Sequence, residues 1–397
     1  MANIEHLLDD IRKDKYCWEM RETFCNALIE TNKAAEEMES TVKKIKNEIT
    51  SVNANAEIID ARCGEKNLGD FNRKISSQLD TNVNSFKNGD FTKYFDTQYK
   101  GAEIYLTYDT STYGTYQSII DKLVLDNCNS LAIIPMLSMA NKTDNFVTKV
   151  CDDSLVTSVF QYAKSKGLKT MLKCHYTGAV TGQYALTPSD KRAWIQSWSD
   201  NVMYYVNLIK NYLDGVCVVN EAVNVTSGNS DLWQTLHNNI KAINSNIFTV
   251  SASTKAELSS SVLFDIVDYI GCNLYIGVGG TDANTVRDLK PNMFRDVQDD
   301  IDWITKLLNI GKAKNKKIMI TEVGCLPYNS GLSTPSAWNG SGGVSQTAQD
   351  IYYKIALGTF LNSSNIIGVF IWNACDGFTF IGNQAETTVR ELFGGVN

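Results

Sequence analysis

Two short stretches decide the fold: GVCVVNEA at residues 215–222 and KKIMITEVG at residues 316–324. In each, an apolar run ends in a glutamate, Glu221 in the first and Glu322 in the second. A near-continuous apolar run of this length is typical of a strand buried on both faces of a parallel sheet. An unpaired carboxylate is costly to bury at the end of such a strand, so both glutamates point to a function rather than to packing.

The same pattern of strands recurs from residue 101 to the end of the chain. Six further apolar runs lie at 102–108, 131–139, 168–176, 247–254, 269–277 and 366–374. Amphipathic helical patterns separate the runs, so the sequence predicts an α/β fold, a (β/α)8 TIM barrel over residues 101–397. An open doubly wound sheet gives a similar alternation. That fold usually has a glycine-rich phosphate turn after its first strand, and YDTSTYGTY at 108–116 is not one.

Enzymes with this barrel carry their chemistry at the C-terminal ends of the strands. Glu221 and Glu322 end the fourth and seventh strands, so they are expected to face each other across the mouth. Such a pair suits cleavage of a glycosidic bond, which needs one carboxyl to protonate the leaving oxygen and one carboxylate to attack the anomeric carbon. The strand ends also supply further candidate side chains for the site: Lys173, His175, Asn220, Tyr275 and Trp372.

Each candidate also has a purely structural alternative. Glu221 and Glu322 could cap turns, and His175, Tyr275 and Trp372 could pack in the barrel wall. The loop 325–344, which is rich in Gly and Ser, adds Trp338 as a residue that could stack on a sugar ring.

Composition excludes several other classes of function. The formal net charge of −7 argues against nucleic acid as the main partner. No apolar run approaches the roughly 20 residues of a membrane span, so no membrane partner is expected. The 10 cysteines form no C-x-x-C pair, and we expect free thiols. No His, Cys and Asp cluster has metal-ligand spacing, so we expect no metal and no cofactor.

The first 100 residues divide into three parts. Residues 1–27 form a short helical anchoring segment by pattern, and 61–100 form a polar connector. Between them, residues 28–60 carry a heptad, whose apolar positions are Ala35, Met38, Val42, Ile45, Ile49, Val52, Ala56 and Ile59. Isoleucine at both seam positions favours trimers or tetramers, so a coiled-coil stalk and a homotrimer are expected. The alternative is an amphipathic helix that packs on its own domain.

The strand-end motifs resemble a known group of enzymes. VVNEA (218–222) and ITEVG (320–324) resemble the acid/base and nucleophile motifs of glycoside hydrolase clan A. MLKCHYTGAVTG (171–182), VDYIGCNLY (267–275) and GVFIWN (368–373) resemble the corresponding strands of family 113 endo-β-mannanase-like barrels.

The resemblance implies a role for each matching residue. Glu221 would be the acid/base and Glu322 the nucleophile, with Tyr275 donating its hydroxyl to orient Glu322. It also implies that Asn220 binds the sugar 2-hydroxyl and that His175 and Lys173 line the glycone subsites. Trp372 would form the platform beneath the sugar.

The N-terminal part resembles a different group. LLDDIRKDKYCWEMRETFCNAL (7–28) and DARCGEKNLGDF (60–71) are similar to segments that open tail and baseplate proteins of phages of Gram-positive bacteria. The resemblance implies other tail proteins as partners and a location on the virion tail. Together the two resemblances imply a retaining glycosidase that cleaves a bacterial surface polysaccharide. The alternative is a receptor-binding protein that holds the glycan without turnover. Both carboxylates are present, which favours the enzyme.

Overall fold

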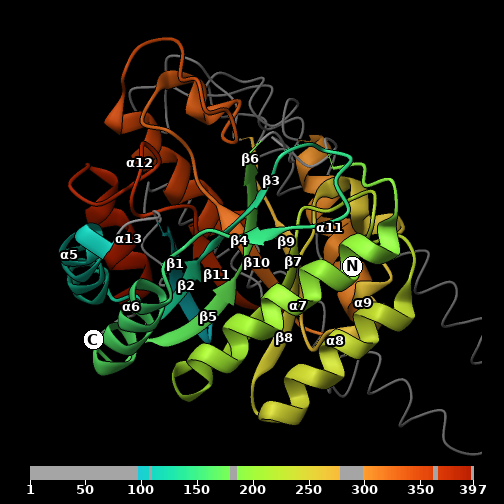
Figure 1. The fold of residues 1–397 in the computed structure, drawn as a ribbon. Coiled ribbons are helices and arrows are strands. Elements are labelled where there is room, and N and C mark those ends of the chain that lie inside the picture. The colour runs from blue at the N-terminus through green and yellow to red at the C-terminus, as the bar shows by residue number, and fades with distance from the viewer. Residues whose placement is uncertain (1–96, 107–109, 179–185, 278–297, 361–364, 395–397) are drawn as a thin grey trace, which may run out of the picture. The chain divides into compact units, whose positions relative to one another are not determined.

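The structure, a computed structural model, describes residues 97–106, 110–178, 186–277, 298–360 and 365–394. The predicted anchoring segment, the heptad stalk and most of the connector therefore lie outside the described residues. In the described part, strands form a central ring and helices lie on its outside (Figure 1).

The elements alternate along the chain as the sequence predicts. The strands are β1 (Tyr99–Tyr105), β2 (Ser130–Ile134), β3 (Met136–Met139), β4 (Thr148–Lys149), β5 (Lys169–Lys173), β6 (His175–Gly178), β7 (Gly215–Asn220), β8 (Phe248–Ala252), β9 (Ile270–Asn273), β10 (Ile318–Val323) and β11 (Ile366–Ile371). The α-helices are α5 (Tyr113–Leu125), α6 (Asp153–Ser165), α7 (Lys191–Ile209), α8 (Ser230–Ile243), α9 (Leu263–Ile266), α11 (Gln298–Ala313), α12 (Gln346–Ile355) and α13 (Ala385–Gly394). Shorter 3₁₀ or π turns cover Thr110–Thr112, Lys210–Tyr212, Lys255–Ser259, Asn329–Leu332 and Ala356–Phe360.

The main sheet has 8 parallel strands in the order β8-β7-β5-β2-β1-β11-β10-β9. Parallel bridges Val250–Tyr269 and Ser253–Cys272 join its two edge strands, β8 and β9. The Ser253 amide donates to the Gly271 carbonyl at 3.2 Å across this junction. These contacts bring the edges of the sheet together, so the predicted (β/α)8 barrel is confirmed for the described residues.

Two of the predicted strands are each divided in the structure. The run 131–139 becomes β2 and β3 on either side of Pro135, and the run 168–176 becomes β5 and β6 on either side of Cys174. Proline has no amide hydrogen, so it cannot donate to the ladder of a central strand. Beyond these breaks β3 and β6 pair with each other and leave the ring, and β4 joins them in a separate sheet of 3 strands.

Alternate residues of the strands fill the inside of the ring, as the period of two requires. An apolar cluster that includes Met171, Cys217, Met319 and Phe370 occupies the interior. The interior becomes charged two residues after Gly101 on β1 and two residues after Met171 on β5. Glu103 and Lys173 occupy these positions, and both are fully buried. The first strand begins at Tyr99, so the barrel starts slightly before the predicted connector ends.

Two long helices begin at aspartates that satisfy their first amides. Asp152 accepts from the amides of Ser154 and Leu155 at the start of α6, and Asp190 caps α7 in the same way. Such caps each contribute about 1 kcal/mol to a helix.

All 8 helices of the described chain lack a stretch that is long and apolar enough to cross a membrane. The cysteines that the structure describes all have free thiols.

The junction of β8 and β9 gives a test of the closed ring. A methyl group added at Gly271 would lie 1.6 Å from the Ser251 carbonyl oxygen. We therefore expect Gly271→Ala to lower the free energy of unfolding by about 1–3 kcal/mol in urea titrations. Gly114→Ala is the matched control, since its methyl group would meet open space on α5. It should stabilise the protein by about 0.5–1 kcal/mol, and equal stability of the two variants would contradict the closed junction.

Candidate active site

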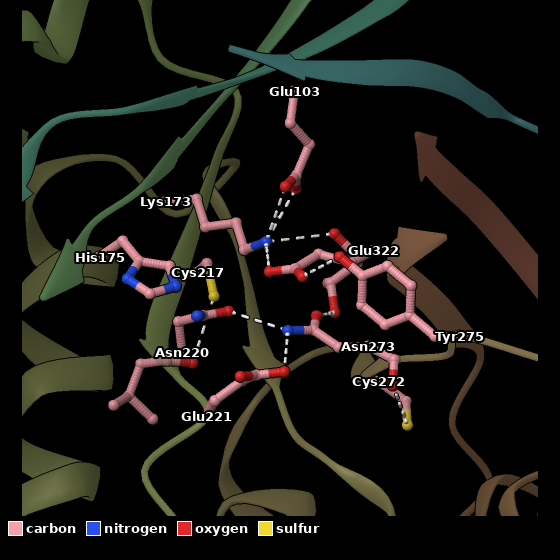
Figure 2. Close-up of polar contacts among 12 residues, drawn as sticks. Glu103, Lys173, His175, Cys217, Asn220, Glu221, Cys272, Asn273, Tyr275 and Glu322 are labelled. Carbon is pink, nitrogen blue, oxygen red and sulfur yellow. Dashed lines mark hydrogen bonds and ion pairs between the residues drawn. The ribbon is translucent and has the colours of Figure 1, made fainter. Parts of the chain in front are cut away.

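Glu221 directly follows β7 and Glu322 lies near the end of β10, at the same end of the ring. Figure 2 shows their side chains among residues from β1, β5, β6, β7 and β9 and from the segment that follows β9. Because all the strands are parallel, their C-terminal ends converge here, which is where barrels of this type gather functional groups.

Both oxygens of the Glu322 carboxylate accept hydrogen bonds. The Lys173 ammonium donates to Oε1 at 2.5 Å, and the Tyr275 hydroxyl donates to Oε2 at 2.7 Å. Burial, followed by the charge of Glu322, raises the pKa of Tyr275 well above its ordinary value, so its hydroxyl keeps its proton. Each oxygen of Glu322 thus has its own donor, which fixes the orientation of the carboxyl group.

Lys173 is fully buried, and Glu103 compensates its charge from the far side (Figure 2). Its Nζ atom lies 2.9 Å from each oxygen of Glu103 and also donates to the Thr321 carbonyl at 3.3 Å. Burial alone lowers the pKa of Lys173, but Glu103 and Glu322 raise it above its ordinary value. The group therefore remains an ammonium ion.

Glu221 has a different environment. Its Oε1 atom accepts one hydrogen bond, from Asn273 Nδ2 at 2.9 Å. Burial, followed by the negative charge of Glu322, raises the pKa of Glu221 to about 7. The Glu221 carboxyl is therefore divided between its acid and base forms near neutral pH, as a group that gives and then takes a proton must be.

The backbone of Glu221 is held in an unusual conformation. Its φ angle is +46°, in the left-handed region that residues other than glycine rarely adopt. Two hydrogen bonds fix it there: the Glu221 amide donates to the Ala252 carbonyl at 2.8 Å, and the Tyr176 hydroxyl donates to the Glu221 carbonyl at 2.7 Å. Such strain persists only where the surroundings impose it, and it sets the direction of the side chain.

Asn220 and His175 offer polar atoms beside the two carboxyl groups. The Oδ1 atom of Asn220 accepts from Asn273 at 3.1 Å, while its Nδ2 atom is buried and has no partner among the described residues. The Nδ1 atom of His175 lies 2.8 Å from the Tyr176 carbonyl, which can only accept, so Nδ1 carries the proton. Burial lowers the pKa of His175, so the ring is neutral and its Nε2 atom can accept a hydrogen bond.

Aromatic rings extend the site towards solvent. The Trp372 ring lies 6.2 Å from His175, and Lys173 Nζ lies 5.4 Å from its centre. Trp338 packs edge-on against Trp372 at 6.2 Å and against Phe378 at 5.2 Å, yet its side chain remains 62% exposed. A large exposed ring beside buried carboxyl groups offers a flat apolar surface to a ligand.

Comparison with known proteins agrees with this geometry. The family model described as Glycoside Hydrolase Family 113 matches residues 114–386. The chain belongs to glycoside hydrolase family 113. No curated protein sequence is similar enough to be matched.

Solved structures of family 113 share this fold. The β-mannanase AaManA of Alicyclobacillus acidocaldarius, solved in complex with ManMIm, is 18% identical with a TM-score of 0.64, over 76% of this chain and 98% of that one. A GH113 β-1,4-mannanase solved as a complex is 15% identical with a TM-score of 0.63, over 76% of this chain and 100% of that one. A Faecalibacterium prausnitzii β-glucuronidase is 13% identical with a TM-score of 0.51, over 75% of this chain and 49% of that one.

The structure brings most of the candidates for this family 113 site together. Glu221, Glu322, Tyr275, Asn220 and His175 lie in the cluster of Figure 2, and Trp372 and Trp338 lie beside it. Lys173 differs from expectation. It was predicted to line the sugar subsites, but its ammonium is buried and engaged by Glu103, Glu322 and the Thr321 carbonyl.

Sequence reasoning assigned no role to Glu103, Asn273 or Tyr176. Glu103 had a usable signal, because it is the one acidic residue in the apolar run AEIYLTY at 102–108. Asn273 and Tyr176 lie at strand ends, but their hydrogen bonds to Glu221 join segments far apart in the chain. In the ranges that the structure describes, no three His, Cys, Asp or Glu side chains could together hold a metal ion.

The pKa of Glu221 leads to a prediction for the pH dependence of this family 113 enzyme. The protonated form is lost as pH rises through about 7, so kcat/KM should fall on that side of its pH profile. Asn273→Ala removes a donor that lowers the pKa of Glu221, so the basic limb should move to higher pH. Asn238→Ala, on the exposed face of α8, is the control and should leave the limb in place. A limb that stays fixed in Asn273→Ala would argue against Glu221 as the titrating group.

Proposed function

We propose that this family 113 protein is a retaining glycosidase that acts by double displacement, with Glu322 as nucleophile and Glu221 as acid/base. The observation that carries the proposal is the contrast between the two carboxyl groups. Glu322 is held by the Lys173 ammonium and the Tyr275 hydroxyl, whereas the pKa of Glu221 is raised to about 7. Two carboxyl groups whose environments separate them in this way suit the two roles.

In the first step, an oxygen of Glu322 attacks the anomeric carbon as the glycosidic bond breaks. The departing oxygen takes its proton from Glu221, which becomes a carboxylate. The result is a glycosyl ester on Glu322. The unpartnered Nδ2 atom of Asn220 is available to donate to the sugar 2-hydroxyl, and Nε2 of His175 can accept from another hydroxyl.

In the second step, Glu221 takes a proton from a water molecule. That water attacks the anomeric carbon and releases Glu322 as a carboxylate. The two displacements together retain the configuration at the anomeric carbon. The chemistry uses two carboxyl groups and water and requires no cofactor.

The proposed substrate is a polysaccharide of the bacterial cell surface, cut within the chain. Two observations make a β-mannoside linkage the first to assay: the chain belongs to family 113, and two β-mannanases have this fold. The exposed ring of Trp338 beside Trp372 supports a site that binds more than one sugar residue.

We also propose that the N-terminal region attaches the enzyme to a phage tail or baseplate and makes it a homotrimer. The support is in the sequence: the heptad of residues 28–60 and the resemblance of residues 7–28 and 60–71 to tail proteins. Other tail proteins would then be its partners, and the enzyme would act at the surface of the host cell.

Variants of the two glutamates test the mechanism. Glu322→Ala should lose turnover on polysaccharide, and azide should restore cleavage with a product of inverted configuration, because azide attacks from the vacated position. Glu221→Ala should lose about 10²–10⁴-fold on polysaccharide but much less on aryl glycosides with good leaving groups, which need no proton. Colorimetric assays and NMR of the products measure both effects.

The control for these variants is Glu386→Gln, which changes a carboxyl group on α13 that pairs with Arg390. Its activity should equal that of the wild type. If the wild type releases no reducing ends from β-mannan or from purified cell-wall polysaccharides, the protein is instead a glycan-binding receptor protein.

The oligomeric state has a separate test. Light scattering of the full chain should give the mass of a trimer, and Ile45→Asp with Ile49→Asp should give a monomer, because charge in the seam opposes association. Lys44→Asp, at an outward-facing position of the same heptad, should stay trimeric. A monomeric wild-type chain would end the proposal of a trimer while leaving the mechanism untouched.

A further inference from the structure

A chain of buried hydrogen bonds joins β10, β9 and the end of β7. The Thr321 hydroxyl donates to Asn273 Oδ1 at 2.7 Å. The Nδ2 atom of Asn273 in turn donates to Asn220 Oδ1 at 3.1 Å and to Glu221 Oε1 at 2.9 Å (Figure 2). Thr321 and Asn220 are 0% exposed, and Asn273 is 2% exposed. Water therefore does not replace these partners.

The register of β10 explains how Thr321 reaches this chain. The pairing of β10 with β9 shifts between Ile320 and Glu322, which leaves Thr321 as the extra residue on β10. An extra residue of this kind redirects the side chains around it. The side chains of two successive residues, Thr321 and Glu322, consequently both have buried polar partners.

The Thr321 hydroxyl determines which way the Asn273 amide points. An asparagine amide has an acceptor end and a donor end. Because the hydroxyl donates to the acceptor end, the donor end is directed at Asn220 and Glu221. In the reverse orientation, Asn273 Oδ1 would face two other oxygens. The bond to Asn220 Oδ1 then orients the second amide, whose Nδ2 atom has no partner among the described residues.

We propose that Thr321 is a positioning residue for the acid/base Glu221 and that it acts through Asn273. Its hydroxyl holds the Asn273 amide in the orientation that donates to Glu221. The same orientation leaves the Nδ2 atom of Asn220 free to donate to an oxygen of the substrate. This inference rests on the proposed role of Glu221.

Several elements contribute titratable groups that interact with Glu221. These groups are Glu103, Lys173, Tyr176, Glu257, Cys272, Tyr275 and Glu322. Thr321 is not titratable, so a substitution of Thr321 changes none of these charges directly. A change in the titration of Glu221 would therefore report on its hydrogen bond from Asn273.

Replacing Thr321 gives a test with a matched control. Burial and the charge of Glu322 raise the pKa of Glu221, whereas the hydrogen bond from Asn273 lowers it. Thr321→Val keeps the shape but removes the hydroxyl, so the Asn273 amide is no longer held and the pKa of Glu221 should rise by at least about half a unit. Thr321→Ser keeps the hydroxyl and should preserve the wild-type titration.

A double variant tests whether Thr321 acts through Asn273. Asn273→Ala alone should also raise the pKa of Glu221, because it removes the donor itself. Adding Thr321→Val to Asn273→Ala should cause no further shift, because no amide is left to orient. A role of Thr321 in packing alone would not produce this pattern.

The measurement is carbon NMR of the full-length protein labelled with ¹³C at the glutamate side-chain carboxyl. The Glu221 signal is assigned by its loss in Glu221→Gln, and its shift is followed against pH in each variant. Wild-type titration of Glu221 in Thr321→Val, or shifts that add in the double variant, would overturn the inference. Should Thr321→Val fail to fold, Thr321→Ala removes the same hydroxyl with a smaller side chain.

Activity separates this inference from the proposed function. In Thr321→Val the basic limb of the kcat/KM profile should move to higher pH, on β-mannan or on the wall polysaccharide that the wild type cleaves. An NMR shift in a protein that cleaves no glycan would end the proposed function and keep the link from Thr321 to Glu221. Cleavage by the wild type together with an unchanged titration in Thr321→Val would end the inference alone.

Discussion

At the C-terminal ends of the barrel strands, the arrangement of the polar side chains depends on one ammonium ion that is buried away from water. Lys173 is fully buried, and such a charge is tolerated only when close partners of opposite sign surround it. Glu103 and Glu322 are those partners, and they come from β1 and β10 on either side of β11 in the sheet. The closed ring therefore does more than bury apolar side chains, because it brings polar side chains from three strands into contact with one another.

The same arrangement gives two glutamates unlike properties. Glu322 accepts from an ammonium and a phenol, while Glu221 accepts from an amide and carries a pKa of about 7. The left-handed backbone at Glu221 directs the second carboxyl, and Tyr176 and Ala252 hold that backbone. The proposed nucleophile and the proposed acid thus differ in their surroundings, although the residue type is the same.

Much of this could be predicted from the sequence, because strand burial and strand ends leave local signals. The apolar runs located the eight strands, and Glu221 and Glu322 were found because each ends such a run. What the sequence could not show depends on contacts between distant segments. The pairing of Glu103 with Lys173 and the φ angle of Glu221 arise from neighbours more than 20 residues away. The break after Ile134 did have a local signal, because Pro135 interrupts the run 131–139. The stalk lies outside the described residues and stays a prediction.

Glu322 and Glu221 are proposed to cleave glycosidic bonds by two successive displacements. The most direct test is proton NMR of the wild-type enzyme digesting β-mannan or a host wall polysaccharide, recorded before the new reducing ends mutarotate. The first-formed anomer should have the configuration of the bond that was cut. A first product of the opposite configuration would contradict it, because a single displacement by water would then have occurred.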